Sequence, residues 1–140
     1  DYIVHLRPTT PLRDFCLIDK AIQEFQKDES FTSLRSAHLM SETAYKTFEL
    51  EDGMFKSSFS GISNLDALNI GRQAFPITYS PNGYVDILKS KFILKNNLLH
   101  GDRVQAFITP KVTDIDSIED FEFLIYQLNK DNSIFNKLFT

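Results

Sequence analysis

The N-terminal stretch constrains the fold more than any other part, because a strand, a stiff loop and a helix follow one another directly. Residues 2–6 are apolar apart from His5, a composition typical of a buried strand. Two prolines in residues 7–13 fix their own φ angles and keep the residues before them out of helical geometry. A helix is predicted from about residue 14 to 27, with Asp14 as its N-cap. This succession indicates an α/β fold.

The loop at residues 7–13 predicts an anion-binding corner. It carries Arg7 and Arg13 together with the hydroxyls of Thr9 and Thr10, just beyond the carboxyl end of the first strand. In open α/β sheets ligands bind at that end of the strands. Because guanidinium groups pair with carboxylates and phosphates, we expect an anionic small molecule there.

Composition and charge exclude several classes of protein. A chain of 140 residues is long enough for one domain with its own core. The net charge is −4, whereas nucleic-acid binders normally carry a basic face. The single cysteine excludes an internal disulfide framework, and no apolar run reaches the roughly 18 residues of a membrane helix. We therefore expect a cytoplasmic protein that binds neither nucleic acid nor membrane.

The rest of the pattern predicts a mixed sheet flanked by helices. Strands are expected at residues 31–35, 84–88 and 104–108, and helices at residues 90–97 and 117–128. Ser117 and Asp120 have the spacing of a capping box at the start of the last helix.

A hairpin and a long irregular excursion are predicted between these elements. Residues 45–50 and 54–59 are expected to pair around a turn at 51–53, and residues 60–80 to lack regular structure. Neither arm has a clear core face. We therefore expect the segment from about 45 to 80 to project outward from a single domain that spans residues 1–140.

Two carboxylates after the last strand are candidate metal ligands. In extended geometry Asp114 and Asp116 point to the same side, with Cα atoms roughly 6–7 Å apart. Such a pair can bind a hard cation such as Mg²⁺. It can equally cap the following helix and favour its positive end, so the spacing leaves both interpretations open.

Other polar residues have simpler interpretations. Pro81-Asn82-Gly83 is first of all a turn, because Asn and Gly tolerate positive φ, and a functional reading needs the Asn82 amide to face a ligand. Lys46 is predicted to lie within the hairpin on a solvated strand face.

Five of these elements together resemble the CMP-sialic acid synthetase (acylneuraminate cytidylyltransferase) family. They occur in the family's order and at similar separations: residues 6–13, Lys46 after Ser41-Glu42-Thr43, Arg72-Gln73 before Pro76, Pro81-Asn82-Gly83, and Asp114-Ile115-Asp116. Enzymes of this family transfer CMP from CTP to the anomeric hydroxyl of a nine-carbon keto-acid sugar and release pyrophosphate. The resemblance implies a three-layer fold of the nucleotide-diphospho-sugar transferase type. It also implies a homodimer in which an outlying hairpin reaches towards the partner's site.

The resemblance also assigns roles to single residues. It implies that Asp114 and Asp116 bind Mg²⁺, and that Lys46 and Arg72 act as cations for the sugar carboxylate or the phosphates. Residues assigned to the acceptor sugar are Arg7, Thr9, Thr10, Tyr79 and Asn82.

The chain departs from the family in two ways. Many relatives carry Gln where this chain has Arg7, so the acceptor is expected to be a related sialic-acid-like acid. The family's N-terminal nucleotide loop is missing, and the chain starts without Met almost directly in a strand, which suggests part of a longer protein. We therefore expect the 140 residues alone to be inactive. Two alternatives stay open: a non-catalytic sugar-acid binding or assembly module, and a cytidylyltransferase for the eight-carbon acid Kdo.

Overall fold

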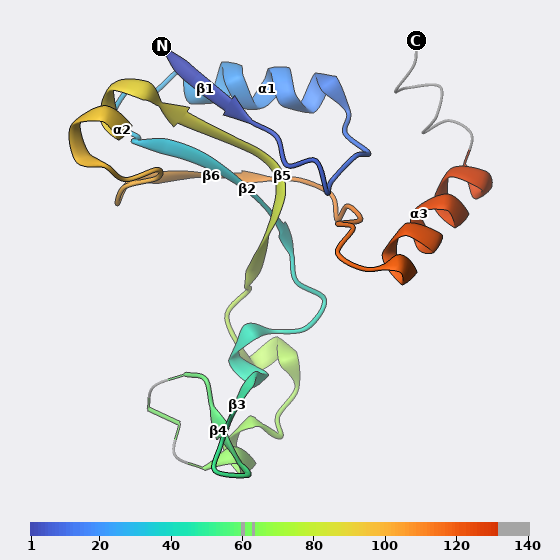
Figure 1. The fold of residues 1–140 in the computed structure, drawn as a ribbon. Helices are drawn as coiled ribbons and strands as arrows, with labels where there is room; N and C mark the ends of the chain where they lie inside the picture. Colours follow the sequence, from blue (N-terminus) through green and yellow to red (C-terminus); the bar gives the residue numbers. More distant parts are fainter. Residues whose placement is uncertain (60, 63, 132–140) are drawn as a thin grey trace. The chain divides into compact units, whose positions relative to one another are not determined.

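The computed structural model describes residues 1–59, 61–62 and 64–131. Contacts divide the chain into two compact units, which we call the sheet unit (Asp1–His38 and Pro81–Thr140) and the insertion unit (Leu39–Ser80). The described chain is mixed α/β, as predicted (Figure 1). In the described range, no helix is both long and apolar enough to cross a membrane.

The sheet unit is built on four strands in the order β1-β5-β2-β6. These strands are β1 (Tyr2–His5), β2 (Ser33–Leu39), β5 (Tyr79–Lys89) and β6 (Val104–Ile108). β1 pairs antiparallel with β5, with Tyr2 opposite Lys89, whereas β2 pairs parallel with β6, with Ser33 opposite Val104. Both kinds of pairing occur, so the predicted mixed sheet is confirmed.

Helix α1 (Phe15–Phe25) lies against one face of this sheet (Figure 1). The Asp14 side chain accepts a hydrogen bond from the Cys16 amide at 2.9 Å, which confirms the predicted N-cap. Ala21 and Phe25 are buried on the helix, whereas Phe15 is 60% exposed. Phe15 is the first residue of the helix and lies outside the core cluster. The core cluster comprises Ala21, Phe25, Leu34, Tyr84, Val85, Ile87 and Phe107.

Two further helices follow the sheet strands. Helix α2 (Ser90–Asn96) continues directly from β5 and ends at Asn97, which takes the left-handed conformation typical of a helix C-terminus. Helix α3 (Ile118–Lys130) begins with the predicted capping box, in which Ser117 and Asp120 bond reciprocally.

The predicted Pro81-Asn82-Gly83 turn is wrong, because these residues lie inside β5. Gly83 has φ +62°, and the Asn82 Oδ1 atom accepts a hydrogen bond from the Tyr84 amide at 3.2 Å. The local preferences that predict a turn are thus satisfied by an irregularity within the strand.

β2 also starts two residues later than predicted, at Ser33, and runs on to Leu39.

The insertion unit holds the predicted hairpin, formed by β3 (Phe48–Glu51) and β4 (Met54–Ser57). Asp52 and Gly53 both have positive φ, as a tight two-residue hairpin turn requires. Tyr45 and Lys46 do not belong to the predicted strand but to a 3₁₀ turn of three residues, η1 (Ala44–Lys46). The cause is local: the Thr43 hydroxyl caps the turn by accepting from the Tyr45 amide at 3.3 Å.

The segment after the hairpin, predicted to lack regular structure over residues 60–80, contains two short 3₁₀ turns. These turns are η2 (Leu65–Leu68) and η3 (Arg72–Ala74). Tyr45 stacks on Phe59 and Phe75, with ring centroids 4.4 and 5.8 Å away. Aromatic stacking therefore ties the start of this unit to its end.

Candidate functional site

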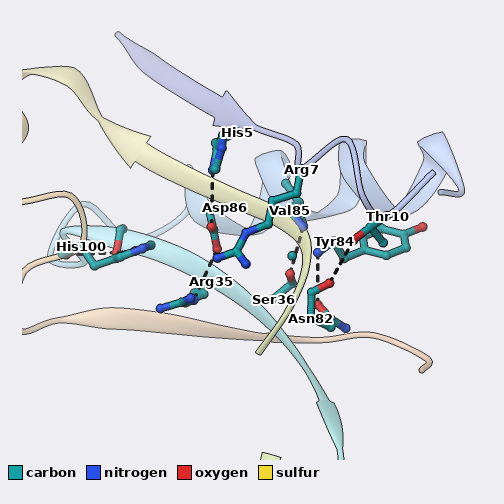
Figure 2. A network of polar contacts seen from close by, with 12 residues as sticks. His5, Arg7, Thr10, Arg35, Ser36, Asn82, Tyr84, Val85, Asp86 and His100 are labelled. Carbon is teal, nitrogen blue, oxygen red and sulfur yellow. Dashed lines mark hydrogen bonds and ion pairs between the residues drawn. The ribbon is translucent and has the colours of Figure 1, made fainter. Parts of the chain in front are cut away.

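Three sequence elements meet in the sheet unit around the buried hydroxyl of Thr10. Its Oγ1 atom lies 3.4 Å from Asp114 Oδ1 and 3.3 Å from the Asn82 carbonyl oxygen, so a single proton is shared between two acceptors. These partners are 104 and 72 residues away along the chain. Figure 2 shows Thr10 directed at Asn82 on the neighbouring strand. The structure thus brings together the proline-bearing loop, the Pro-Asn-Gly element and the Asp-Ile-Asp element.

Backbone hydrogen bonds hold the loop and the carboxylate segment side by side. The Thr10 amide donates to the Arg7 carbonyl at 3.2 Å, which closes a turn inside the loop. The Ile115 amide donates to the Thr9 carbonyl at 2.8 Å. Since Ile115 stands between the two carboxylates, this bond fixes both of them next to the loop.

The Arg13 side chain connects the loop to β5. Its Nε atom donates to the Tyr84 carbonyl at 2.7 Å, and its Nη2 atom donates to the carbonyls of Gly83, at 3.1 Å, and Arg7. Burial lowers the pKa of the Arg13 guanidinium, and the nearby Tyr84 and Asp114 oppose that shift. The group stays charged at neutral pH, because an arginine is not deprotonated under such conditions.

Asn82 supports the site through its own amide. Its Nδ2 atom donates to Thr109 Oγ1 at 2.6 Å, while its Oδ1 atom accepts from the Tyr84 amide. Asn82 and Thr109 are both buried. One donor and one acceptor position of the amide are therefore used inside the protein, and its assignment to a sugar pocket stays a prediction.

The acidic residues differ in how far they are engaged. Asp120 accepts from the Ser117 hydroxyl and from the Asp116 amide, and these bonds lower the pKa of the Asp120 carboxyl. Asp114 is half-buried and bonded to Thr10, whereas Asp116 is exposed. The Asp120 carboxylate is thus engaged in the helix cap.

The donor set fits Mg²⁺ only in part. Across residues 1–59, 61–62 and 64–131, no three acidic, histidine or cysteine side chains are grouped so that they could hold a metal ion. Mg²⁺, however, is often bound by one or two carboxylates, with water and substrate phosphates completing the shell. Binding of Mg²⁺ by Asp114 and Asp116 in that mode stays a prediction.

A cavity of about 350 Å³ opens beside the loop in the sheet unit. Its wall is largely apolar and includes Leu12, Leu17 and Val112, with Arg13 and Lys111 as cations. An apolar pocket with a few polar groups is the usual form of a small-molecule site. The loop therefore borders a space that can admit a ligand.

The remaining residues predicted for the site lie elsewhere or face differently. Lys46, Arg72 and Tyr79 belong to the insertion unit, so their place beside Asp114 stays a prediction. Arg72 donates to the Ser41 carbonyl and lines a cavity of about 280 Å³ within that unit. Arg7 is in the sheet unit and its side chain crosses Gly83, where an added Cβ would lie 2.6 Å from Arg7 Cδ.

Sequence reasoning missed a charged cluster on β5. Asp86 is buried, with His5 Nδ1 at 3.6 Å and Arg35 Nε at 3.8 Å from its carboxylate oxygens (Figure 2). The available signal was an aspartate between Val85 and Ile87, in a segment (residues 84–88) that is otherwise apolar. Because β1, β5 and β2 are neighbours, the cluster joins three strands.

Comparison with known proteins adds no family: no family model matches the chain, and no curated protein sequence matches it. The resemblance to the cytidylyltransferases therefore depends on the five sequence elements alone.

Proposed function

We propose that the chain is the acceptor-binding and metal-binding part of a cytidylyltransferase that transfers CMP from CTP to a sialic-acid-like sugar acid. The observation that carries this proposal is the hydrogen-bonded meeting of Thr10, Asn82 and Asp114. These residues come from three of the five elements that resemble the family, and they are far apart in sequence. Their meeting is what a shared site requires.

Asp114 and Asp116 would hold Mg²⁺ in this function. The bound ion would neutralise charge on the phosphates and align the reacting oxygens. The Thr10 hydroxyl orients the Asp114 carboxylate, because it donates to Oδ1. Outer hydrogen bonds of this kind fix the direction of a metal ligand.

The loop at residues 7–13 would contact the acceptor. Arg7 supplies a guanidinium for a carboxylate, and Thr9 supplies a hydroxyl for a polar group of the sugar. The cavity beside Arg13 supports this assignment, because it lies along the same loop.

The insertion unit would serve a homodimer. Its hairpin exposes Phe48, Leu50, Met54 and Phe55, and a second subunit would remove these side chains from water. In this arrangement Lys46, Arg72 and Tyr79 would act at the partner's site.

The metal-binding role is tested by titrating the 140-residue chain with Mn²⁺ and measuring the free ion by electron paramagnetic resonance. D114N and D116N should each weaken Mn²⁺ binding by at least about tenfold, since removing one of two carboxylates removes half of the protein ligands. D102N is the matched control, because Asp102 is exposed and lies on the loop before β6. Equal affinity in D114N, D116N and D102N would contradict the proposed function.

The acceptor role is tested by saturation-transfer NMR with the sialic-acid-like acid KDN and with its methyl ester. The acid should receive saturation from the protein and the ester should receive much less, because the ester lacks the carboxylate that the loop binds. Equal transfer to both compounds would remove the anion-binding role of the loop.

A further inference from the structure

Arg13 is bonded in an unusual way for a half-buried cation. Its three hydrogen bonds all go to backbone carbonyls, those of Arg7, Gly83 and Tyr84. Within the described part of the chain no carboxylate lies at ion-pair distance from it. The guanidinium is therefore used as a rigid fork of donors that links two backbone segments.

We propose that Arg13 is a positioning residue, which sets the Thr10 hydroxyl on Asp114 by joining the loop at residues 7–13 to β5. This inference rests on the proposed function, because it concerns the same site. The three carbonyls belong to the two segments that flank Thr10: Arg7 starts the loop, and Gly83 and Tyr84 follow Asn82 on the strand. Fixing these segments fixes the distance from Thr10 to the Asn82 carbonyl.

The Arg7 carbonyl couples Arg13 to Thr10 directly. This oxygen accepts hydrogen bonds from both the Arg13 guanidinium and the Thr10 amide. If the guanidinium is lost, the carbonyl and the turn that it closes can move. The Thr10 side chain would then lose its place between its two acceptors.

Two further hydrogen bonds connect the end of the loop to β5. The Tyr84 hydroxyl accepts from the Asp14 amide at 2.5 Å and donates to the Asp14 carbonyl at 3.2 Å. The Arg13 side chain thus bonds to the backbone of Tyr84, and the Tyr84 side chain bonds to the backbone of Asp14, the residue after Arg13. Lysine cannot replace this arrangement, because it has one ammonium group on a flexible stem and no planar fork.

The test is a double-mutant cycle on Mn²⁺ affinity with T10V, R13K and T10V/R13K. T10V should weaken binding about tenfold, as expected for loss of an outer hydrogen bond to a metal ligand. R13K should weaken it several-fold, and the double variant should bind no more weakly than T10V, because Arg13 acts through Thr10. R103K is the control, since Arg103 contacts Ser30 and Phe31 away from the site. Additive effects of T10V and R13K, or wild-type affinity in R13K, would overturn the proposal.

A metal-free readout separates this proposal from the proposed function. In R13K the Thr10 amide should exchange with solvent faster, while the amides of Ala21 and Phe25 in α1 keep their protection. Unchanged exchange at Thr10 would overturn the positioning role whatever the metal result. A third outcome is that the wild-type chain does not bind Mn²⁺ but the Thr10 amide exchanges faster in R13K. This outcome would overturn the proposed function and would still show that Arg13 holds the loop in place.

The unmodified protein gives a further test, should R13K fail to fold. The Arg13 Nε–H group is bonded to the Tyr84 carbonyl, whereas Arg103 forms its hydrogen bond to Ser30 through Nη2. We expect slower solvent exchange of the Nε–H proton at Arg13 than at Arg103. Equal exchange rates would contradict the positioning role of Arg13.

Discussion

The two units differ in what stabilises them. Among the described residues of the sheet unit, nine apolar side chains are buried, and they are spread over α1, α3 and three of the strands: Ala21, Phe25, Leu34, Tyr84, Val85, Ile87, Leu88, Phe107 and Leu124. Among the described residues of the insertion unit, Leu68 alone is a buried hydrophobic side chain. The insertion unit depends instead on capped turns, one hairpin and the stacked rings around Tyr45. The sheet unit therefore has a hydrophobic core of its own, whereas the described part of the insertion unit buries little apolar surface.

The hairpin of the insertion unit exposes large apolar side chains. Leu50 is 70% exposed and Phe55 is 63% exposed, on a sheet of only two strands. Two-stranded hairpins are marginal in water without a packed face. A second subunit would supply that face, so the exposed apolar side chains of the hairpin support the proposed homodimer.

The largest expected contrast comes from removing one phenylalanine in each unit. F25A should destabilise the protein by about 3–5 kcal/mol, because it opens a cavity in a packed core, while F55A should cost far less in the monomer. Denaturant unfolding of both variants measures the difference. Similar losses would show that the hairpin is packed as tightly as the core.

A smaller contrast comes from the same substitution at two threonines. T109V removes the acceptor of the buried Asn82 amide and should cost about 1–3 kcal/mol. T47V removes a hydrogen bond to the Ala44 carbonyl, which is exposed, so water replaces it and stability should hardly change. Thermal unfolding checks both variants, and a larger loss in T47V would reverse the comparison.

The aromatic stack should have a local effect. Y45L should weaken the insertion unit by about 0.5–1.5 kcal/mol, because the ring contacts with Phe59 and Phe75 are lost. Hydrogen exchange should then rise at the hairpin amides and stay constant at the core amides of β5. Faster exchange in β5 would mean that the two units do not unfold separately.

The smallest effect concerns acid sensitivity at the start of α3. Hydrogen bonds from Ser117 and Asp116 lower the pKa of Asp120 below its ordinary value. A depressed pKa means that the cap stabilises the helix above the pKa of the unfolded chain, and that this contribution is lost as the pH falls through the folded pKa. S117A should therefore raise the Asp120 pKa in an NMR titration. An unchanged value would remove the Ser117 hydroxyl as the cause.

The sequence predicted those parts of the fold that depend on local signals. The Asp14 N-cap, the Ser117–Asp120 capping box and the strand from Val104 to Ile108 are all confirmed. Local signals failed where distant partners decide the structure. Asn82 and Gly83 prefer a turn, yet they lie in β5, where the Val85 amide donates to the Ser36 hydroxyl of the neighbouring strand.

The candidate site could be predicted as a set of residues but not as an arrangement. Thr10, Asn82 and Asp114 were each assigned to a site through the family resemblance, but their meeting depends on the order of strands in the sheet. Arg13 was hardest to interpret from sequence, because a guanidinium that binds only carbonyls has no charged partner to indicate its role. Thr109 likewise gave no signal beyond its position after the last strand.

The most direct test of the proposed site is paramagnetic line broadening by Mn²⁺ in a ¹⁵N-resolved NMR spectrum of the chain. We predict selective broadening of the amides around Thr10, Asn82, Asp114 and Asp116, with the amides of Lys95 and Asn96 in α2, which follows the opposite end of β5 in the same unit, unaffected. Broadening that centres on α2, or that spreads evenly over the sheet unit, would contradict a metal site beside Thr10.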